Sequence, residues 1–121
     1  MQSDLAKVLH PVAGRPMIGW VLDALGATFP ARTMVVVGYQ ADQVRRVLPG
    51  WAESCLRAEQ LGTGHAVSIA LDALGEVEPE ATLLVVAGDM PLITTGLLDR
   101  LLTSDPTSPL RLVTARVADT R

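Results

Sequence analysis

A chain of 121 residues has room for one domain, and its net charge of -3 at pH 7 leaves no basic stripe for a nucleic-acid partner. Hydrophobic residues make up 49% and charged residues 19%, so the chain is too apolar for disorder. No apolar stretch approaches the roughly 18 residues that span a membrane, and the single Cys55 cannot form an internal disulfide, so we expect a cytoplasmic protein.

The chain opens with a segment that predicts a loop followed by a helix. Residues 1–16 lack the apolar run of a signal peptide and are interrupted by Pro11, Gly14 and Pro16, which indicates a loop. The helix has Pro16 in its first turn and Gly26 at its end. Its apolar positions recur at the helical spacing: Ile18, Val21, Leu22 and Leu25.

The middle of the chain predicts two strands around a second helix. Residues 33–38 form a short Val-rich run that is typical of a buried strand. Residues 41–48 carry one apolar helical face and are followed by Pro49 and Gly50, which end a helix. Residues 54–59 predict a further short strand.

Two more helices flank the strongest strand pattern. Thr63 can cap a helix with apolar positions Ala66, Ile69, Ala70 and Ala73. Residues 82–87 (TLLVVA) have the strongest strand pattern in the chain. Thr94 or Thr95 starts a helix that carries Leu97, Leu98, Leu101 and Leu102.

Residues 105–106 (Asp-Pro) are expected to end that helix, and residues 110–117 predict a last strand. The alternation of helices and strands predicts an α/β fold, a Rossmann-like three-layer sandwich with a mainly parallel sheet across residues 1–121. No strand precedes the first loop, although the first strand of a doubly wound sheet is usually central. The fold is therefore expected to lack its usual first central strand.

The first candidate site residue is Asp89, which follows the strongest strand pattern. Ligands of such sheets bind beyond the carboxyl ends of the strands. A carboxylate there can hold Mg²⁺, which takes one or two carboxylates together with phosphate oxygens and water. The alternative is that Asp89 only caps a turn before Pro91.

Two further segments fall at the same expected edge of the sheet. Gly62 and Gly64 flank a helix start, so a ligand can approach the backbone N–H groups there. The alternative is a plain loop with Thr63 as the helix cap. Lys7 is a compact positive charge that can neutralise a phosphate, or it is simply a solvated side chain.

Four segments gain specificity from their order and spacing: residues 3–10 (SDLAKVLH), 13–17 (AGRPM), 58–66 (AEQLGTGHA) and 88–93 (GDMPLI). Together they resemble the N-acetylglucosamine-1-phosphate uridylyltransferases of bacteria, the nucleotidyltransferase half of the bifunctional GlmU family. The resemblance extends over essentially the whole chain. It implies a GT-A-like, Rossmann-like fold.

The resemblance also implies a role for each candidate residue. Lys7 would be the catalytic and phosphate-binding cation, and Gly62 and Thr63 would contact uracil. Asp89 would hold Mg²⁺ with Gly88 beside the nucleotide. A phosphate oxygen of N-acetylglucosamine 1-phosphate would attack the α-phosphorus of UTP, and pyrophosphate would leave. Catalysis would come from positioning and charge neutralisation rather than from a covalent intermediate.

The chain departs from this family pattern at its start, at its end, and at Ala6 and Arg57, where the family usually has Pro and Gln. The family begins with a strand and a Gly-rich loop that precede the position of Met1, and it continues beyond Arg121, so we expect a chain truncated at both ends and inactive alone. The β-helix acetyltransferase half is absent from this sequence. Arg57 stands where the family has a Gln that reads uracil, and a guanidinium only donates hydrogen bonds. A non-catalytic remnant and a molybdenum-cofactor guanylyltransferase or other sugar-phosphate nucleotidyltransferase are the alternative functions.

Overall fold

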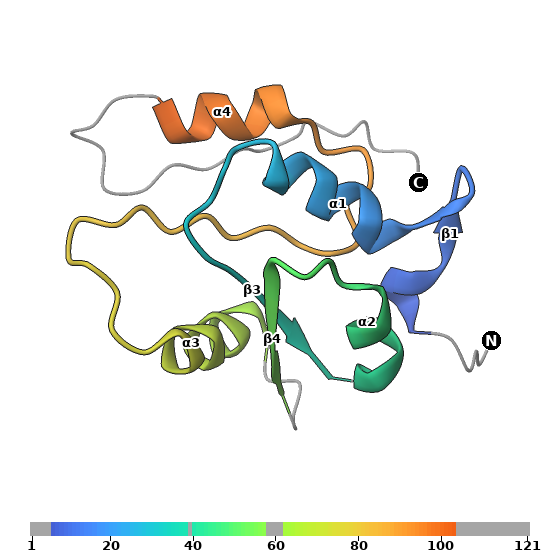
Figure 1. Ribbon diagram of the computed structural model, residues 1–121, viewed down its shortest axis with the longest axis horizontal. Coiled ribbons are helices and arrows are strands. Elements are labelled where there is room, and N and C mark those ends of the chain that lie inside the picture. Colours follow the sequence, from blue (N-terminus) through green and yellow to red (C-terminus); the bar gives the residue numbers. More distant parts are fainter. Residues whose placement is uncertain (1–5, 39, 58–61, 104–121) are drawn as a thin grey trace, which may run out of the picture.

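The computed structural model describes residues 6–38, 40–57 and 62–103. Figure 1 shows α1 and α4 stacked on one side of β3, with α3 on the other side, so helices cover the strand on both faces. This arrangement and a parallel strand pair confirm the α/β class. In chain order the elements are η1 (Lys7–Leu9), β1 (Pro11–Val12), β2 (Arg15–Pro16), α1 (Met17–Gly26), β3 (Thr33–Val37), α2 (Ala41–Val47), β4 (Ala52–Leu56), α3 (Thr63–Leu74) and α4 (Thr95–Thr103).

The described part of the predicted N-terminal loop contains regular structure. After the 3₁₀ turn η1, β1 and β2 pair antiparallel as a hairpin with two residues at its tip. These two residues, Ala13 and Gly14, have φ angles of 51° and 82°. Two successive positive φ angles are what a tight hairpin turn requires, and glycine adopts them without strain. The loop prediction was wrong for residues 7–16, because Gly14 marks the turn of a hairpin and Pro11 and Pro16 lie opposite each other in its two short strands.

One aromatic side chain of α1 contacts the β1–β2 hairpin. The Nε1–H of Trp20 donates a hydrogen bond of 2.7 Å to the carbonyl oxygen of Val12. The guanidinium of Arg15 lies 4.7 Å from the centroid of the Trp20 ring, within the range of a cation–π contact. The helix ends at Gly26, as the sequence predicted, whereas Pro16, predicted in its first turn, is the residue directly before α1.

β3 and β4 form a parallel pair with Thr33 opposite Ala52 and Val37 opposite Leu56. The pairing continues one residue further, since the N–H of Arg57 donates 2.7 Å to the carbonyl oxygen of Val37. The predicted strand at residues 33–38 is confirmed. The β4 strand begins earlier than predicted, because its backbone follows the register of β3 rather than its own hydrophobicity.

The core lies where η1, α1 and α2 meet the carboxyl end of β3. Burial of an aliphatic side chain contributes about 1.5–3 kcal/mol, so this cluster stabilises the fold around η1. Partly buried apolar side chains extend the cluster at its edge. Its buried members are Ala6, Leu9, Ile18, Leu22, Val37 and Val44, and the partly buried ones are Val8, Val35, Ala41 and Leu48.

Residues 82–87, predicted as the strongest strand, form no strand. The segment crosses the molecule as an unpaired chain, and no backbone hydrogen bond within the described ranges joins it to a neighbour. Leu83 and Val85 are each 53% exposed, whereas Leu84 and Val86 are half-buried. The prediction was wrong because an aliphatic run indicates burial, and a strand also requires a backbone partner.

The last two helices begin at different kinds of cap. Gly62, with φ of 96° and ψ of 177°, occupies the N-cap of α3, so Thr63 is the first helical residue and not the predicted cap. Thr94 precedes α4, and its Oγ1 accepts a hydrogen bond of 3.2 Å from the N–H of Leu97. This is the cap geometry that the sequence predicted for α4.

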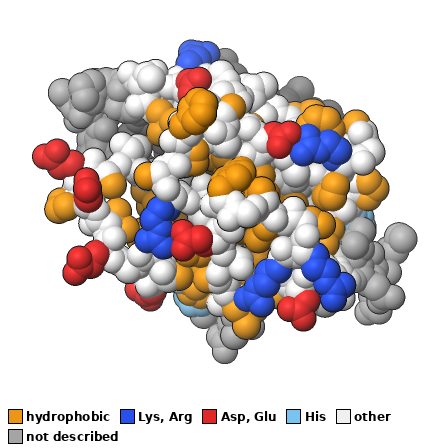
Figure 2. Space-filling view, viewed as in Figure 1, with side chains coloured by type: hydrophobic (Ala, Val, Ile, Leu, Met, Phe, Trp, Pro, Cys, Tyr) orange, Lys and Arg blue, Asp and Glu red, His pale blue; other side chains and the backbone are white. Residues whose placement is uncertain are grey.

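Many apolar side chains of residues 62–103 stay at the surface, and Figure 2 shows hydrophobic groups between the charged ones on one face of the molecule. The predicted helix end at residues 105–106 and the predicted strand at 110–117 lie outside the described residues. Within the described ranges, every helix is too short or too polar to cross a membrane.

Candidate functional site

Lys7 stands at the carboxyl end of β3 on a backbone that is held on both sides. The N–H of Ala6 donates 3.2 Å to the Oε1 of Gln43 on α2. The N–H of His10 donates 3.1 Å to the carbonyl oxygen of Lys7, which closes the η1 turn. Ala6 and Leu9 are buried in the core, so the turn presents Lys7 outward from a fixed base.

A close backbone approach brings the turn after residues 82–87 against η1. A Cβ atom on Gly88 would lie 3.3 Å from Cγ1 of Val8 and 4.0 Å from Cδ1 of Ile18. The first separation is tighter than ordinary van der Waals contact, so a side chain at Gly88 would require Val8 to shift by a few tenths of an ångström. Glycine at this position permits the close approach of the Gly88–Asp89 turn to η1.

Lys7 and Asp89 meet directly. The Nζ of Lys7 lies 3.2 Å from Oδ2 of Asp89, and the two side chains are 77% and 39% exposed. An ion pair this exposed contributes about 0–1 kcal/mol to stability. The contact therefore contributes little to the stability of the fold. It shows instead that two candidate residues from distant parts of the chain lie on one patch of the surface.

Gly62 and Thr63 do not join this pair. Both are exposed at the start of α3, which lies on the far side of the β3–β4 pair from η1 (Figure 1). The carbonyl oxygen of Gly62 accepts from the N–H of Ala66 at 3.2 Å and from Nη1 of Arg57 at 3.3 Å. Within the described ranges, no hydrogen bond or ion pair links Gly62 or Thr63 to Lys7 or Asp89. Their contact with uracil stays a prediction.

Two features of the site were missed by sequence reasoning. Gln43 supports the Lys7 turn, and its only sequence signal is a polar side chain in the first turn of the helix after β3. Near Gly62, Nε of Arg57 and Nδ1 of His65 are buried and have no hydrogen-bond partner among the described residues. A buried polar atom without a partner is costly, so these atoms mark a polar position that a ligand can satisfy.

The residues around Asp89 fit one kind of metal site. No group of three or more His, Cys, Asp or Glu side chains suited to a metal occurs within the described residues, so they hold no cage made of protein side chains alone. Asp89 is a partly exposed carboxylate that already attracts one cation, the ammonium of Lys7. A lone carboxylate fits Mg²⁺ that keeps most of its ligands from phosphate and water.

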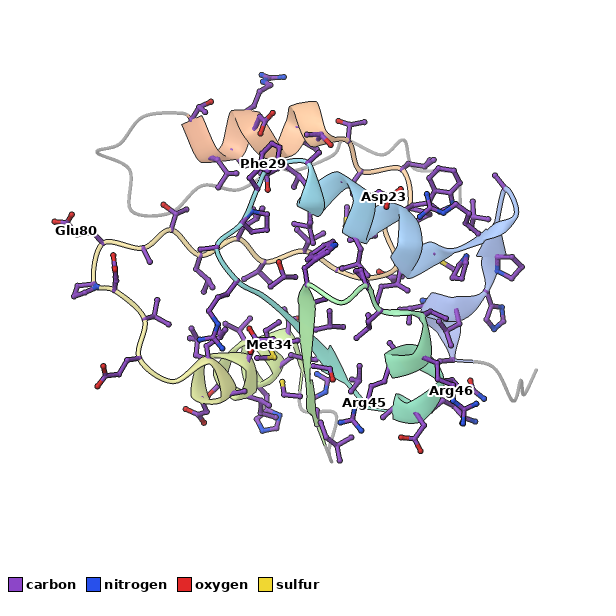
Figure 3. The ribbon with its side chains drawn as sticks, in the orientation of Figure 1. Asp23, Phe29, Met34, Arg45, Arg46 and Glu80 are labelled. Atoms are coloured by element: carbon purple, nitrogen blue, oxygen red, sulfur yellow. The ribbon has the colours of Figure 1, made fainter. Side chains whose placement is uncertain are left out.

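The other ionisable groups have structural roles. The guanidinium of Arg15 donates 2.6 Å to Oδ2 of Asp23 and holds the pKa of that carboxyl below its usual value. Figure 3 shows Asp23 on α1, on the side of the hairpin. Cys55 lies half-buried in β4, and burial raises the pKa of its thiol, which disfavours the reactive thiolate.

Two shallow hollows surround Trp51, at the opposite end of β3 from Lys7. They measure about 220 and 180 Å³, and both lack the candidate site residues. Their cations are already paired, since Arg32 forms two hydrogen bonds to the carboxylate of Glu53 at 2.7 and 2.9 Å. Phe29, at the rim of the larger hollow, is 90% exposed (Figure 3). These hollows offer no unpaired charge to a phosphate.

Comparison with known proteins gives one family and several relatives. The model of the MobA-like NTP transferase domain matches residues 1–121. The chain is 52% identical over 102 residues to a protein of Rubrobacter xylanophilus named bifunctional protein GlmU, covering 84% of this chain and 21% of that protein. The proteins of the same name from Streptococcus suis and Thermotoga maritima are 52% identical over 94 residues and 43% identical over 102 residues.

The alignments cover 78% and 84% of this chain, and 20% and 22% of those two proteins. The chain thus spans about a fifth of the length of the curated relatives that it matches.

Proposed function

Because this chain belongs to the MobA-like NTP transferase family, we propose that its protein transfers a nucleotidyl group to a sugar phosphate. The proposed donor is UTP, the acceptor is N-acetylglucosamine 1-phosphate, and the products are UDP-N-acetylglucosamine and pyrophosphate. The relatives named GlmU support this choice. The four sequence segments that resemble the uridylyltransferases point to the same reaction.

The proposed chemistry needs little from the protein beyond position and charge. A phosphate oxygen of the acceptor forms a bond to the α-phosphorus of UTP, and the bond from that phosphorus to the bridging oxygen of pyrophosphate breaks. Lys7 would donate hydrogen bonds to phosphate oxygens and reduce their negative charge. Asp89 would hold Mg²⁺, with the backbone of Gly88 close to the nucleotide. Mg²⁺, when bound, supplies further neutralisation of the triphosphate.

One observation carries the proposal: the distance of 3.2 Å between the Nζ of Lys7 and the Oδ2 of Asp89. The reaction requires a phosphate-binding cation and a metal-binding carboxylate on the same patch. The two residues come from segments 3–10 and 88–93, whose resemblance to the uridylyltransferases implies these two roles. Gly62 and Thr63 are proposed to contact the base from the start of α3, with Arg57 hydrogen-bonded to the Gly62 carbonyl.

A second candidate, guanylyl transfer, is favoured by Arg57. Its guanidinium only donates hydrogen bonds, and the Hoogsteen edge of guanine presents two acceptors, O6 and N7. In the structure Nη1 of Arg57 contacts the Gly62 carbonyl, and Nε is buried without a partner. The identity to the GlmU proteins leads us to prefer UTP over GTP.

A nucleotide panel tests the proposal. The purified protein is titrated with UTP, GTP, dTTP and ATP in the presence of Mg²⁺, and the heat of binding is measured. We expect UTP to bind most tightly, and a preference for GTP or dTTP would replace the uridylyl assignment. Failure to bind any of the four nucleotides would remove the proposed function.

The role of Asp89 is tested by the change Asp89→Asn, which keeps the side-chain shape and removes the charge. Asp99→Asn is the matched control, since Asp99 is an exposed carboxylate on α4 and forms no ion pair with Lys7. We expect Asp89→Asn to weaken Mg²⁺-dependent UTP binding at least tenfold and Asp99→Asn to leave it unchanged. Unchanged Mg²⁺-dependent binding in Asp89→Asn would rule out its assigned role.

A further inference from the structure

We propose that Lys7 is an internal counter-ion of Asp89. Its ammonium pairs with the Asp89 carboxylate in the free protein and pairs with a phosphate instead when a nucleotide binds. The consequence is that the divalent cation and the nucleotide bind to this site cooperatively. The proposal rests on the function proposed above, and it adds the order and coupling of binding. It follows from the placement of two side chains, each of which is assigned to a different ligand.

The first step of the argument is that the two binding groups block each other in the free site. The ammonium of Lys7 stands 3.2 Å from Oδ2 of Asp89. A Mg²⁺ ion lies about 2.0–2.1 Å from a carboxylate oxygen that binds it. The metal and the ammonium would then lie within a few ångströms of each other, and their like charges repel. A metal ion that binds first therefore competes with Lys7 for the Asp89 carboxylate.

The second step is that the contact is easy to break. Lys7 is 77% exposed at its side chain, and Asp89 is its one ion-pair partner within the described residues. By contrast, Arg32 forms two hydrogen bonds to Glu53 and a third, of 2.7 Å, to the carbonyl oxygen of Leu74. The Arg32 pair has the multiple contacts of a structural link. The single contact of Lys7 has the properties of an exchangeable one.

The third step is that a phosphate resolves the competition. It gives the ammonium a new partner of higher charge and gives the cation additional oxygen ligands. The fixed backbone around Lys7 keeps the ammonium within reach of both partners, because Ala6 and His10 hold the η1 turn in place. Nucleotide binding therefore frees Asp89 for the metal, and the reverse coupling has the same magnitude.

The proposal is tested with Mn²⁺ as the probe, in the absence of nucleotide. Free Mn²⁺ is measured by electron paramagnetic resonance during titration of the purified protein. We expect Lys7→Met, which removes the charge and keeps the length, to bind Mn²⁺ about two- to fivefold more tightly, the range that an exposed ion pair allows. Lys7→Arg keeps the positive charge and should not show this gain in Mn²⁺ affinity. Arg100→Met is the matched control, since Arg100 is exposed on α4.

A second measurement uses the unchanged protein, so it does not depend on how a variant folds. Lys7 is the one lysine of the sequence, and a protein labelled with ¹⁵N-lysine gives one side-chain ammonium signal in nuclear magnetic resonance. We expect this signal to shift when Mg²⁺ is added alone and to shift differently with UTP and Mg²⁺. Equal or weaker Mn²⁺ binding by Lys7→Met, or a signal unmoved by Mg²⁺, would overturn the proposal. Both measurements with metal alone stand apart from the nucleotide panel, whose failure would remove the proposed function instead.

Discussion

Residues 6–57 and residues 62–103 both contain aliphatic patterns. The two regions differ in how many of their apolar side chains are buried. Of the nine buried hydrophobic side chains in the described ranges, eight lie in residues 6–57, and Leu98 is the ninth. In residues 62–103, α3 buries no side chain fully, and Leu92 is 87% exposed.

The difference lies in the partners that each element meets. In residues 6–57 the helices α1 and α2, the η1 turn and β3 contribute to one cluster, and β3 has β4 as its ladder. In residues 62–103, α4 packs on α1, but residues 82–87 meet no backbone partner within the described ranges. Hydrophobic pattern alone therefore does not order a segment, and pairing decides whether it becomes a strand.

The largest expected contrast is in amide hydrogen exchange. The N–H of Arg57 donates to Val37 in the extension of the β3–β4 ladder, whereas the N–H of Val85 has no backbone acceptor among the described residues. Ladder amides exchange through large openings that cost up to the full stability, about 5 kcal/mol or more. We expect Arg57 to exchange at least about a thousandfold more slowly, relative to its intrinsic rate, than Val85. Similar protection at both positions, measured by nuclear magnetic resonance, would break the comparison.

The second-largest expected contrast between the two regions is the loss of stability when a leucine is shortened to alanine. Leu22 is 4% exposed and belongs to the core cluster, so Leu22→Ala should lower the free energy of unfolding by about 2–5 kcal/mol. Leu83 is 53% exposed, and Leu83→Ala should cost less than about 1 kcal/mol. Urea denaturation of both variants gives the comparison. Equal costs would show that residues 82–87 are packed as firmly as the core.

A pair of glycine changes sharpens the comparison within residues 62–103. Gly75 has φ of 74° and ψ of -132°, a conformation that side chains disfavour, and open space surrounds the position of its missing Cβ. Gly75→Ala should therefore destabilise by about 1–3 kcal/mol through the backbone alone. Gly96, inside α4, also has open space, and Gly96→Ala should stabilise by up to about 1 kcal/mol. If both substitutions alter the free energy of unfolding by less than about 0.3 kcal/mol, residues 62–103 do not hold these backbone conformations.

The smallest expected effect concerns the link between the regions. The guanidinium of Arg32 holds the pKa of Glu53 below its usual value through hydrogen bonds, and it also binds the Leu74 carbonyl at the end of α3. Because the pKa is lower in the folded state, the stabilisation is complete above the unfolded value, about 4.3, and is lost as the pH falls through the folded value. Glu53→Gln should therefore make the free energy of unfolding depend less on pH at acidic pH.

Thermal midpoints measured between pH 6 and pH 3 test this expectation. Glu78→Gln is the control, since Glu78 is an exposed carboxylate between α3 and residues 82–87. The same acid slope in Glu53→Gln and in the unchanged protein would contradict the assigned role of the Arg32–Glu53 pair.

The elements that the sequence predicted correctly are those determined by local residues. Pro16 and Gly26 bracket α1, and the Val-rich run of β3 is confirmed. The hairpin was missed because the positive φ of Ala13 is not a preference of alanine and is imposed by the pairing around it. The strand prediction for residues 82–87 was wrong for the same reason, because the sequence of a segment does not show whether a partner strand lies beside it.

The site shows the same limit. Lys7 lies at the carboxyl end of β3, where such sheets bind ligands, but Asp89, its ion-pair partner, follows residues 82–87, which form no strand. The position of Gly62 on the far side of the β3–β4 pair depends on the order of strands in space. No local pattern states that order. The support that Gln43 gives to η1 was invisible for the same reason, because it joins residues that are distant along the chain.

The anchored turn at Lys7 has a kinetic consequence. Its backbone is fixed by the hydrogen bonds at Ala6 and His10, so only the side-chain torsions have to move when the ammonium changes partner. Exposed side chains change rotamer within picoseconds to nanoseconds, whereas enzyme lids move in microseconds to milliseconds. A protein that selects its ligands by exchanging one ammonium can therefore do so without a slow conformational step in its reaction cycle.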